Sequence, residues 1–370
     1  MSRILVIGGY GAFGARVSER LAHEPGLEVI VAGRREDAAA AYAAQLARAA
    51  RARITHAVVD AARATPEQVR ELSASVLINA SGPFQAQSYS LARACIRARC
   101  HYVDLADARA FVTGITQVDR EARAASVSVI SGASSVPGLS SAVVKAYAGE
   151  LATLDAVDIG ISPGNGFDPG LATTESILGA VGRPFNVLSG GGRETVYGWQ
   201  GLRRHRFPQL GARWMSNVEV PDLDLLPARY PGLQTARFSA GVEVGMFHLA
   251  LWGLSWLVRA GVLRDPGRLA APLLGAKRPL RFLGSDAGGM FVALHGRDAQ
   301  GEPRSIEWTL IARSGDGPYV PAIASVILAK RLVAGSGPQP GAQPCFALFT
   351  PADFAAEVSD LDITFSVQRQ

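Results

Sequence analysis

Residues 4–14 constrain the fold of this chain more than any other segment. Ile4–Ile7 is an unbroken apolar run, which is typical of a strand buried on both faces of a parallel sheet. Gly9, Gly11 and Gly14 follow with the spacing G-x-G-x-x-G. In that spacing the first glycine permits a tight turn, the second lets the backbone approach a diphosphate, and the third lets the next helix pack closely on the strand. The free N–H groups at the start of that helix would hold the diphosphate.

The segment after the glycines completes a nucleotide-binding βαβ unit. A helix expected over 15–23 leads to a second apolar strand, Glu28–Ala32, which closes the unit within about thirty residues. An NAD site has an Asp or Glu at the end of this strand to bind the ribose 2′-hydroxyl, but this chain has Gly33, Arg34 and Arg35. Two guanidinium groups suit a 2′-phosphate, and we expect Gly33 to leave room for it. The sequence therefore favours NADP (NADPH) over NAD, with a solvated basic turn as the alternative.

Strands and helices continue to alternate up to about residue 150. Apolar runs predict further strands over 54–59, 76–79, 102–104 and 127–131, separated by helices. This order predicts an α/β fold, with a Rossmann-type doubly wound parallel sheet as a dinucleotide-binding domain over 1–150. Residues 151–320 mix strands, hairpins and helices, including an expected strand over 279–282, and predict a second, α+β domain for substrate binding or oligomerisation. A C-terminal helix and tail, 321–370, could return to the first domain.

The expected cofactor contacts follow from where the parallel strands end. Ligands of doubly wound sheets bind past the carboxyl ends of the strands, where this chain has the small residues of 79–84 and the turn 132–138. We expect the nicotinamide half to pass the first loop and its carboxamide to meet the second. The full set of expected cofactor-binding residues is Gly9, Tyr10, Gly11, Ala12, Phe13, Gly14, Gly33, Arg34, Arg35, Asp60, Asn79, Ala80, Gly82, Pro83 and Pro137.

Three titratable side chains lie nearest to this edge of the sheet. Tyr102, Asp104 and Asp107 are in or just after the fifth expected strand, and strand alternation places Tyr102 and Asp104 on one face. A phenol or a carboxyl group there could relay a proton, so these three residues are the catalytic candidates. The alternative is structural, with Asp104 capping a turn and His101 packing in the core.

Together with the glycine loop, three further motifs make the chain resemble the saccharopine dehydrogenase-like reductases: Asn79–Phe84, His101–Leu105 and Val136–Gly138. The resemblance implies an NAD(P)-dependent oxidoreductase but no substrate, because some members of the family act on C–N bonds of amino acids and others, such as a trans-acting enoyl reductase of lipid biosynthesis, act elsewhere. Three functions stay open: hydride transfer at a C=C or carbonyl group of a small or apolar, acyl-type substrate; an opine- or saccharopine-type C–N dehydrogenase; and a non-catalytic NADP-binding protein.

Composition argues against several other classes. The formal net charge of +5 comes from 37 basic and 32 acidic residues that are spread along the chain, so we expect no nucleic-acid partner. The three cysteines and six histidines have no metal-ligand spacing, so we expect no metal site. No signal peptide precedes the first strand, and we therefore expect a cytoplasmic protein.

The apolar segment Val242–Leu263 has no role in a nucleotide-binding scheme. Glu243, His248 and Arg259 interrupt it, so its uncharged run is too short to span a bilayer. It could pack in the core, form the interface of the homodimer that we expect, or make a peripheral contact with a membrane or lipid. Its tryptophans could also line a channel for an apolar substrate.

Overall fold

The computed structural model describes residues 1–168 and 170–370, which divide into two compact units. Met1–Leu139 and Pro318–Glu357 form the first unit, and Ser140–Gly317 with Val358–Gln370 form the second. The chain passes to the second unit at residue 140 and not at 150, because helix α7 (Ser140–Ala148) packs on strand β13 (Gly288–Arg297). The chain then returns to the first unit at Pro318 and leaves it again after Glu357.

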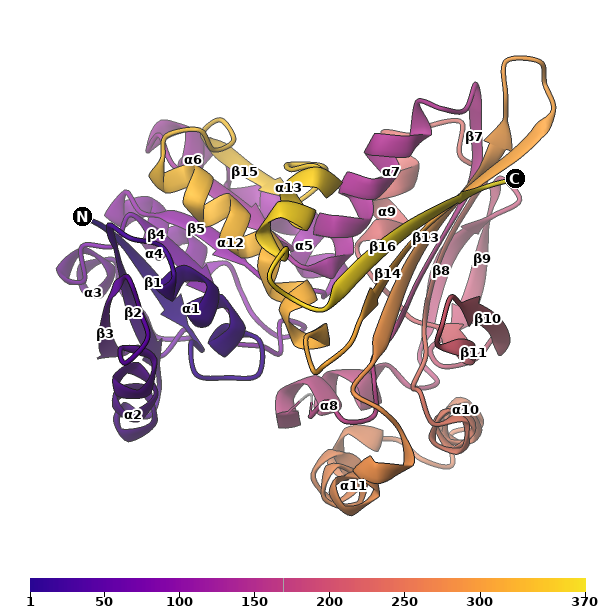
Figure 1. Ribbon diagram of the computed structural model, residues 1–370, viewed down its shortest axis with the longest axis horizontal. Coiled ribbons are helices and arrows are strands. Elements are labelled where there is room, and N and C mark those ends of the chain that lie inside the picture. The colour runs from indigo at the N-terminus through magenta and orange to yellow at the C-terminus, as the bar shows by residue number, and fades with distance from the viewer. Residues whose placement is uncertain (169) are drawn as a thin grey trace. The chain divides into compact units, whose positions relative to one another are not determined.

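A seven-stranded, wholly parallel sheet forms the centre of the first unit, in the order β15-β6-β5-β4-β1-β2-β3 (Figure 1). The order 3-2-1-4-5-6 within it is that of the Rossmann fold, so the predicted fold class is confirmed. Strand β15, after β6, was not expected. The strands are β1 Ser2–Ile7, β2 Leu27–Gly33, β3 Arg53–Val58, β4 Val76–Asn79, β5 His101–Asp104, β6 Ser128–Ser131 and β15 Gly341–Pro344.

Helices from both ends of the chain cover this sheet. Helix α1 packs on β1 and β2, while α12 packs on α1, β4 and β5, so the C-terminal helix extends the layer that α1 begins. Almost the whole circumference of α12 is buried, which explains its nearly continuous apolar sequence. The helices are α1 Gly14–Ala22, α2 Glu36–Leu46, α3 Pro66–Glu71, α4 Ser90–Ala98, α5 Arg109–Thr113, α6 Asp119–Ala124, α12 Val320–Val333 and α13 Pro351–Glu357.

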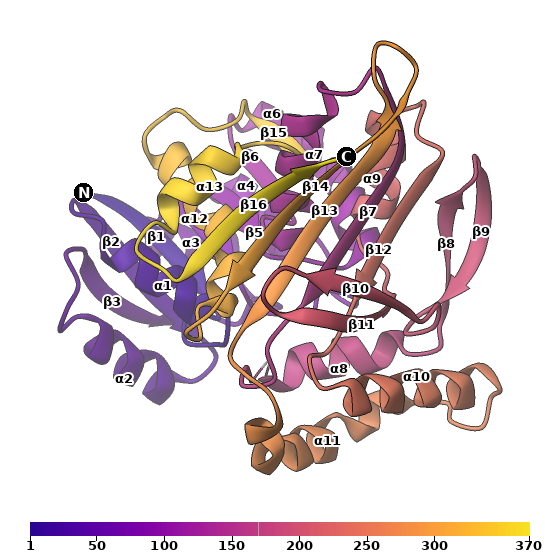
Figure 2. The ribbon, with the colours of Figure 1, turned by 45° about the vertical axis from the view of Figure 1, so that its right-hand side comes forward.

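A nine-stranded mixed sheet forms the centre of the second unit, with the path β10-β11-β12-β7-β13-β14-β16 and with β8 and β9 attached to β12. Among the described residues of this sheet, β7 and β12 pair in parallel and the other pairs are antiparallel. The β10–β11 hairpin crosses one face of this sheet (Figure 2), where the rings of His205 and Phe291 stack with centroids 3.7 Å apart. The remaining strands are β7 Thr153–Ser162, β8 Pro184–Ser189, β9 Gly192–Tyr197, β10 Arg203–Phe207, β11 Gly211–Asn217, β12 Thr235–Ala240, β14 Pro303–Ala312 and β16 Ile363–Arg369.

Three helices of the second unit gather at one end of its sheet: α8 (Gly170–Ala180), α10 (Gly245–Arg259) and α11 (Ala270–Lys277) (Figure 1). A further helix, α9 (Asp222–Arg229), packs on β12 and α7. The expected strand over 279–282 is wrong, because Arg278–Leu283 forms a 3₁₀ helix. None of the helices in the described part of the chain is long and apolar enough to cross a membrane.

Candidate functional site

The loop between β1 and α1 has a backbone path that only small residues allow. A Cβ on Gly14 would lie 2.1 Å from the carbonyl oxygen of Gly8, and one on Gly9 would lie 2.8 Å from that of Val6. The Ser18 hydroxyl donates to the Gly9 carbonyl over 3.0 Å and holds the turn against the helix. The helical hydrogen bonds begin with Ala15 N–H to Gly11 O at 2.9 Å. The N–H groups of the first turn therefore face the loop, in the arrangement that binds anions.

Beside this loop, the end of β2 presents two exposed arginines and one aromatic ring. Arg34 and Arg35 are both exposed. The Tyr10 hydroxyl accepts a hydrogen bond from the Arg35 N–H over 3.1 Å, and the Arg35 guanidinium lies 5.8 Å from the centre of the Tyr10 ring. A Cβ on Gly33 would lie 2.5 Å from that ring. In this structure Gly33 makes room for the Tyr10 ring; its expected place beside a 2′-phosphate stays a prediction.

The loop after β4 is shaped by the buried side chain of Asn79. Its Oδ1 accepts hydrogen bonds from the N–H (3.1 Å) and the hydroxyl (2.5 Å) of Ser81, and its Nδ2 donates to the Tyr102 hydroxyl over 3.3 Å. Gln87 Nε2 donates to the carbonyls of Ser81 (2.6 Å) and Pro83 (3.1 Å). These bonds leave Gly82 and Pro83 exposed, with a cis peptide bond between them. Small, exposed residues next to the glycine loop can approach a ligand closely.

Asp104 joins the ends of β5 and β6. It is fully buried, and its Oδ1 accepts hydrogen bonds from Ser131 Oγ (2.9 Å), Gly132 N–H (2.8 Å) and Ala106 N–H (3.0 Å). Burial raises the pKa of Asp104 to about 6, although these hydrogen bonds act in the opposite direction. A carboxylate so enclosed is suited to holding two loops in place. The sequence did not indicate Ser131 and Gly132 as its partners, because side-chain-to-loop bonds across neighbouring strands leave no periodic pattern.

The other two catalytic candidates lie in contrasting places. Tyr102 is 1% exposed and sits in the core of the first unit, where burial raises the pKa of its phenol well above the usual value. Asp107 is exposed at the surface of that unit. The structure thus brings Tyr102 and Asp104 together in the interior and leaves Asp107 accessible. Their catalytic roles stay predictions.

The remaining expected cofactor residues lie around the same edge of the parallel sheet. Asp60 follows β3 and accepts a hydrogen bond from the Ala62 N–H over 3.0 Å. Pro137 has a cis bond to Val136 and lies in a fully buried turn, where a Cβ on Gly132 would come within 2.7 Å of its ring. Ala80 follows β4, and its N–H donates to Ile7 O over 2.9 Å. The ends of β1, β3, β4 and β6 therefore supply the expected loops.

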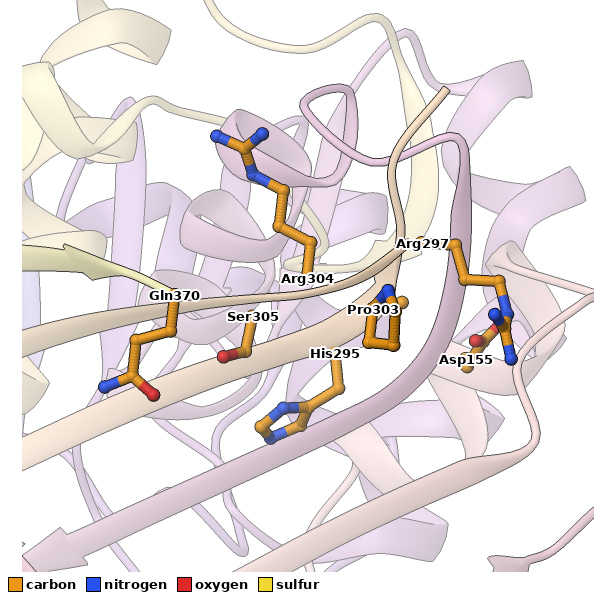
Figure 3. A pocket seen from close by; sticks show the side chains of 8 residues that line it. Asp155, His295, Arg297, Pro303, Arg304, Ser305 and Gln370 are labelled. Atoms are coloured by element: carbon orange, nitrogen blue, oxygen red, sulfur yellow. The ribbon is translucent and has the colours of Figure 1, made fainter. Parts of the chain in front are cut away.

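A hollow of about 330 Å³ lies in the second unit, at the turn end of the β13–β14 hairpin (Figure 3). His295, Ser305 and Gln370 line one part of it, and Asp155 and Arg297 lie at the opposite side. The His295 and Gln370 side chains are exposed to solvent. Among the described residues, no group of three or more His, Cys, Asp or Glu side chains is placed to hold a metal ion.

Comparison with known proteins identifies the first of the two units. Residues 4–130 match the family described as the saccharopine dehydrogenase NADP binding domain. The match covers the glycine loop, the two arginines, the Asn79 loop and Asp104. This segment thus has the features of a saccharopine dehydrogenase-like NAD(P)-binding domain. No curated protein matches the chain.

Two solved structures share the fold over almost the whole chain. The apo saccharopine dehydrogenase (L-Glu forming) of Saccharomyces cerevisiae is 13% identical with a TM-score of 0.71, and the match covers 100% of both chains. The amine dehydrogenase of Mycobacterium smegmatis is 12% identical with a TM-score of 0.52, and the match covers 94% of this chain and 95% of that one. At these identities the likeness extends the saccharopine dehydrogenase-like fold to the second unit, and it concerns the fold alone.

Proposed function

We propose that this protein is an NADPH-dependent oxidoreductase of the saccharopine dehydrogenase-like type. The observation that supports this best is the glycine loop, in which a Cβ on Gly14 would collide with the Gly8 carbonyl at 2.1 Å. A turn this tight, at the start of a helix and beside two exposed arginines, fits a dinucleotide diphosphate and a 2′-phosphate. Bound NADPH would supply a hydride equivalent for the reaction.

Each part of the domain has a separate task in this proposal. The first turn of α1 holds the diphosphate, and Arg34 and Arg35 hold the 2′-phosphate with charge-assisted hydrogen bonds. Tyr10, which already contacts Arg35, offers an aromatic face at that end. Gly82 and Pro83 allow the nicotinamide half to lie against the backbone, while Asp104 fixes the loops after β5 and β6.

For the substrate we propose a small or apolar, acyl-type molecule reduced at a C=C or carbonyl group. An enzyme that joins amino acids must bind several carboxylates, and arginines free for that task are needed. In the second unit Arg213 is held by Glu243 at 3.2 Å, Arg259 stacks on the Tyr197 ring at 3.9 Å, and Arg369 pairs with Glu150 at 2.8 Å. These three arginines are engaged within the unit, whereas Arg193, Arg204 and Arg206 are exposed. The preference for an apolar substrate therefore rests on the apolar segment Val242–Leu263 and not on a lack of available arginines.

Cofactor preference tests the first part of the proposal. In titration calorimetry the double variant Arg34→Ala/Arg35→Ala should bind NADPH at least about a hundredfold more weakly, because each charge-assisted hydrogen bond contributes about 1.5–3 kcal/mol. Its affinity for NADH should change by less than about threefold. The matched control is Arg48→Ala/Arg51→Ala, which removes two exposed arginines beyond α2. An unchanged NADPH preference in the first variant would refute the assigned role of the two arginines.

Turnover tests the second part. NADPH oxidation should be stimulated by α,β-unsaturated acyl thioesters or apolar carbonyl compounds. Oxidation with a 2-oxo acid plus an amino acid, and none with acyl thioesters, would instead show a C–N dehydrogenase. Tight NADPH binding with no oxidation by either class would indicate a non-catalytic NADP-binding protein.

A further inference from the structure

Helix α10 is apolar on its inner side, where Val258 is buried and Leu251 and Leu254 pack against the core, and it is also apolar on much of its outer side. His248 and Ser255 are both fully buried. His248 Nε2 lies 2.9 Å from the Ser216 hydroxyl, and the Ser255 hydroxyl donates to the Trp252 carbonyl over 2.5 Å. On the opposite side Met246, Leu249, Ala250, Trp256 and Leu257 are exposed. A helix at the surface of a protein in water normally carries polar or charged side chains on its outer side.

The outward apolar character continues through the next helices. Val262 is 74% exposed and Phe282 is 78% exposed. Helices α10 and α11 lie at the same end of the second unit in both views (Figures 1 and 2), and Val258 of α10 and Ala270 of α11 belong to one core cluster. We call the exposed set the apolar face: Met246, Leu249, Trp256, Leu257, Val262, Leu273, Phe282 and Leu283. Eight large apolar side chains exposed on neighbouring helices are typical of a surface that binds a partner or a lipid layer.

The segment that carries the apolar face is rich in basic residues, and Arg259, Arg264 and Arg268 are exposed. Residues 245–284 contain six basic residues and a single acidic one, Asp265, whose carboxylate is paired with Arg268 at 3.0 Å. Arg259 ends α10, with its guanidinium 5.1 Å from the centre of the Trp256 ring. An exposed tryptophan beside an arginine suits the boundary between water and lipid, where the ring enters the apolar layer and the charged end meets headgroups. The basic residues of the segment are Arg259, Arg264, Arg268, Lys277, Arg278 and Arg281.

We propose that the apolar face docks on an anionic lipid surface. Exposed Leu, Val, Phe and Trp side chains enter the boundary between headgroups and acyl chains, and the exposed arginines Arg259, Arg264 and Arg268 attract anionic headgroups. The helix lies on the membrane and does not cross it, in agreement with the lack of a membrane-spanning helix in the described residues. The excess of positive charge favours an anionic lipid over a second copy of this chain, whose identical face would carry the same charge. The inference stands apart from the proposed function, since it uses only residues of the second unit.

Vesicle co-sedimentation of the full chain tests this inference. Vesicles of phosphatidylcholine with phosphatidylserine should bind the protein, whereas phosphatidylcholine alone should bind about tenfold more weakly, and added salt should weaken the first interaction. The tryptophan emission should shift to the blue as Trp256 enters the lipid. The variant Leu249→Glu/Leu257→Glu should lose binding by about tenfold or more, because two carboxylates replace two inserted side chains.

A matched control separates docking from a general loss of apolar surface. Val58→Glu replaces a side chain that is 46% exposed, close to the 49% of Leu257, but in the first unit, and it should bind vesicles like the unchanged protein. Circular dichroism and thermal unfolding check that both variants are folded. Equal vesicle binding by Leu249→Glu/Leu257→Glu, or no binding by the unchanged protein, overturns the inference. The inference is also overturned if the unchanged protein is a dimer in the absence of vesicles and Leu249→Glu/Leu257→Glu is a monomer, since the apolar face would then be a subunit interface.

Discussion

The buried carboxyl group of Asp222 should make the second unit less stable as the pH rises. Asp222 is 1% exposed, the Ser140 hydroxyl donates to its Oδ1, and its Oδ2 has no hydrogen-bond partner among the described residues. Burial raises the pKa of Asp222 from 3.8 to about 7, although the Ser140 hydrogen bond acts in the opposite direction. The folded chain therefore binds this proton more tightly than the unfolded chain. The resulting stability is complete below about pH 4 and is lost as the pH rises through about 7.

The size of the effect follows from the two pKa values. Between about pH 5.5 and about pH 8, the difference in proton binding lowers the free energy of unfolding by about 2 kcal/mol. Asp222→Asn is neutral at every pH and keeps an oxygen to accept from Ser140, so this variant should lack that part of the pH dependence. Other titratable groups contribute equally to both proteins. The quantity to compare is therefore the difference in unfolding free energy between the original protein and Asp222→Asn, measured at each pH.

Urea unfolding followed by tryptophan fluorescence measures this difference in the second unit, which contains Asp222. All five tryptophans, Trp199, Trp214, Trp252, Trp256 and Trp308, lie in the second unit. Asp286→Asn, which removes an exposed carboxylate of the same unit, is the matched control. A difference between the original protein and Asp222→Asn that is the same at both pH values would refute the reasoning, as would a difference that changes in the opposite direction.

Three further predictions concern the loop, a buried ion pair and ligand linkage. Gly14→Ala should abolish NADPH binding in calorimetry, because its Cβ would lie 2.1 Å from a backbone oxygen. The control Gly149→Ala, whose Cβ meets nothing within 4 Å, should bind NADPH normally. Retained affinity in Gly14→Ala would contradict the role assigned to the loop. Glu243→Gln should cost about 3 kcal/mol in tryptophan-monitored unfolding, because it leaves the buried Arg213 guanidinium without its carboxylate; a cost below about 1 kcal/mol argues against this. NADPH at a hundred times its Kd should stabilise the first unit by about 2.7 kcal/mol. A melting temperature, followed by far-UV circular dichroism, that does not change on adding NADPH would count against specific binding.

The features that could be predicted from the sequence are those with a local physical cause. Ile4–Ile7 indicates a buried parallel strand because both of its faces must be apolar, and the glycine spacing indicates the turn because a side chain there would collide with the backbone. Strand β15 could not be predicted in this way, because Gly341–Pro344 has neither an apolar run nor an alternation of apolar and polar residues. This strand forms because Val127–Ser131 presents a free edge to which it pairs in parallel. The strand predicted over residues 279–282 was also wrong, because these residues belong to a 3₁₀ helix.

Features that depend on distant side chains could not be predicted. The contact between Tyr10 and Gly33 depends on a ring that crosses from one loop to the end of the next strand, and such a contact leaves no pattern in the sequence. The role of Asp104 in joining two loops needed the positions of Ser131 and Gly132. In α10 the apolar composition predicted a helix, but only the packing of His248 and Ser255 shows which side is exposed.

Titration calorimetry of the full chain with NADPH tests the central claim most directly. We expect saturable binding at one site, because the glycine loop and the two arginines form a single diphosphate and 2′-phosphate site. The absence of any binding heat with NADPH or NADH, for protein that circular dichroism shows to be folded, would contradict the assignment of the first unit as a working cofactor domain.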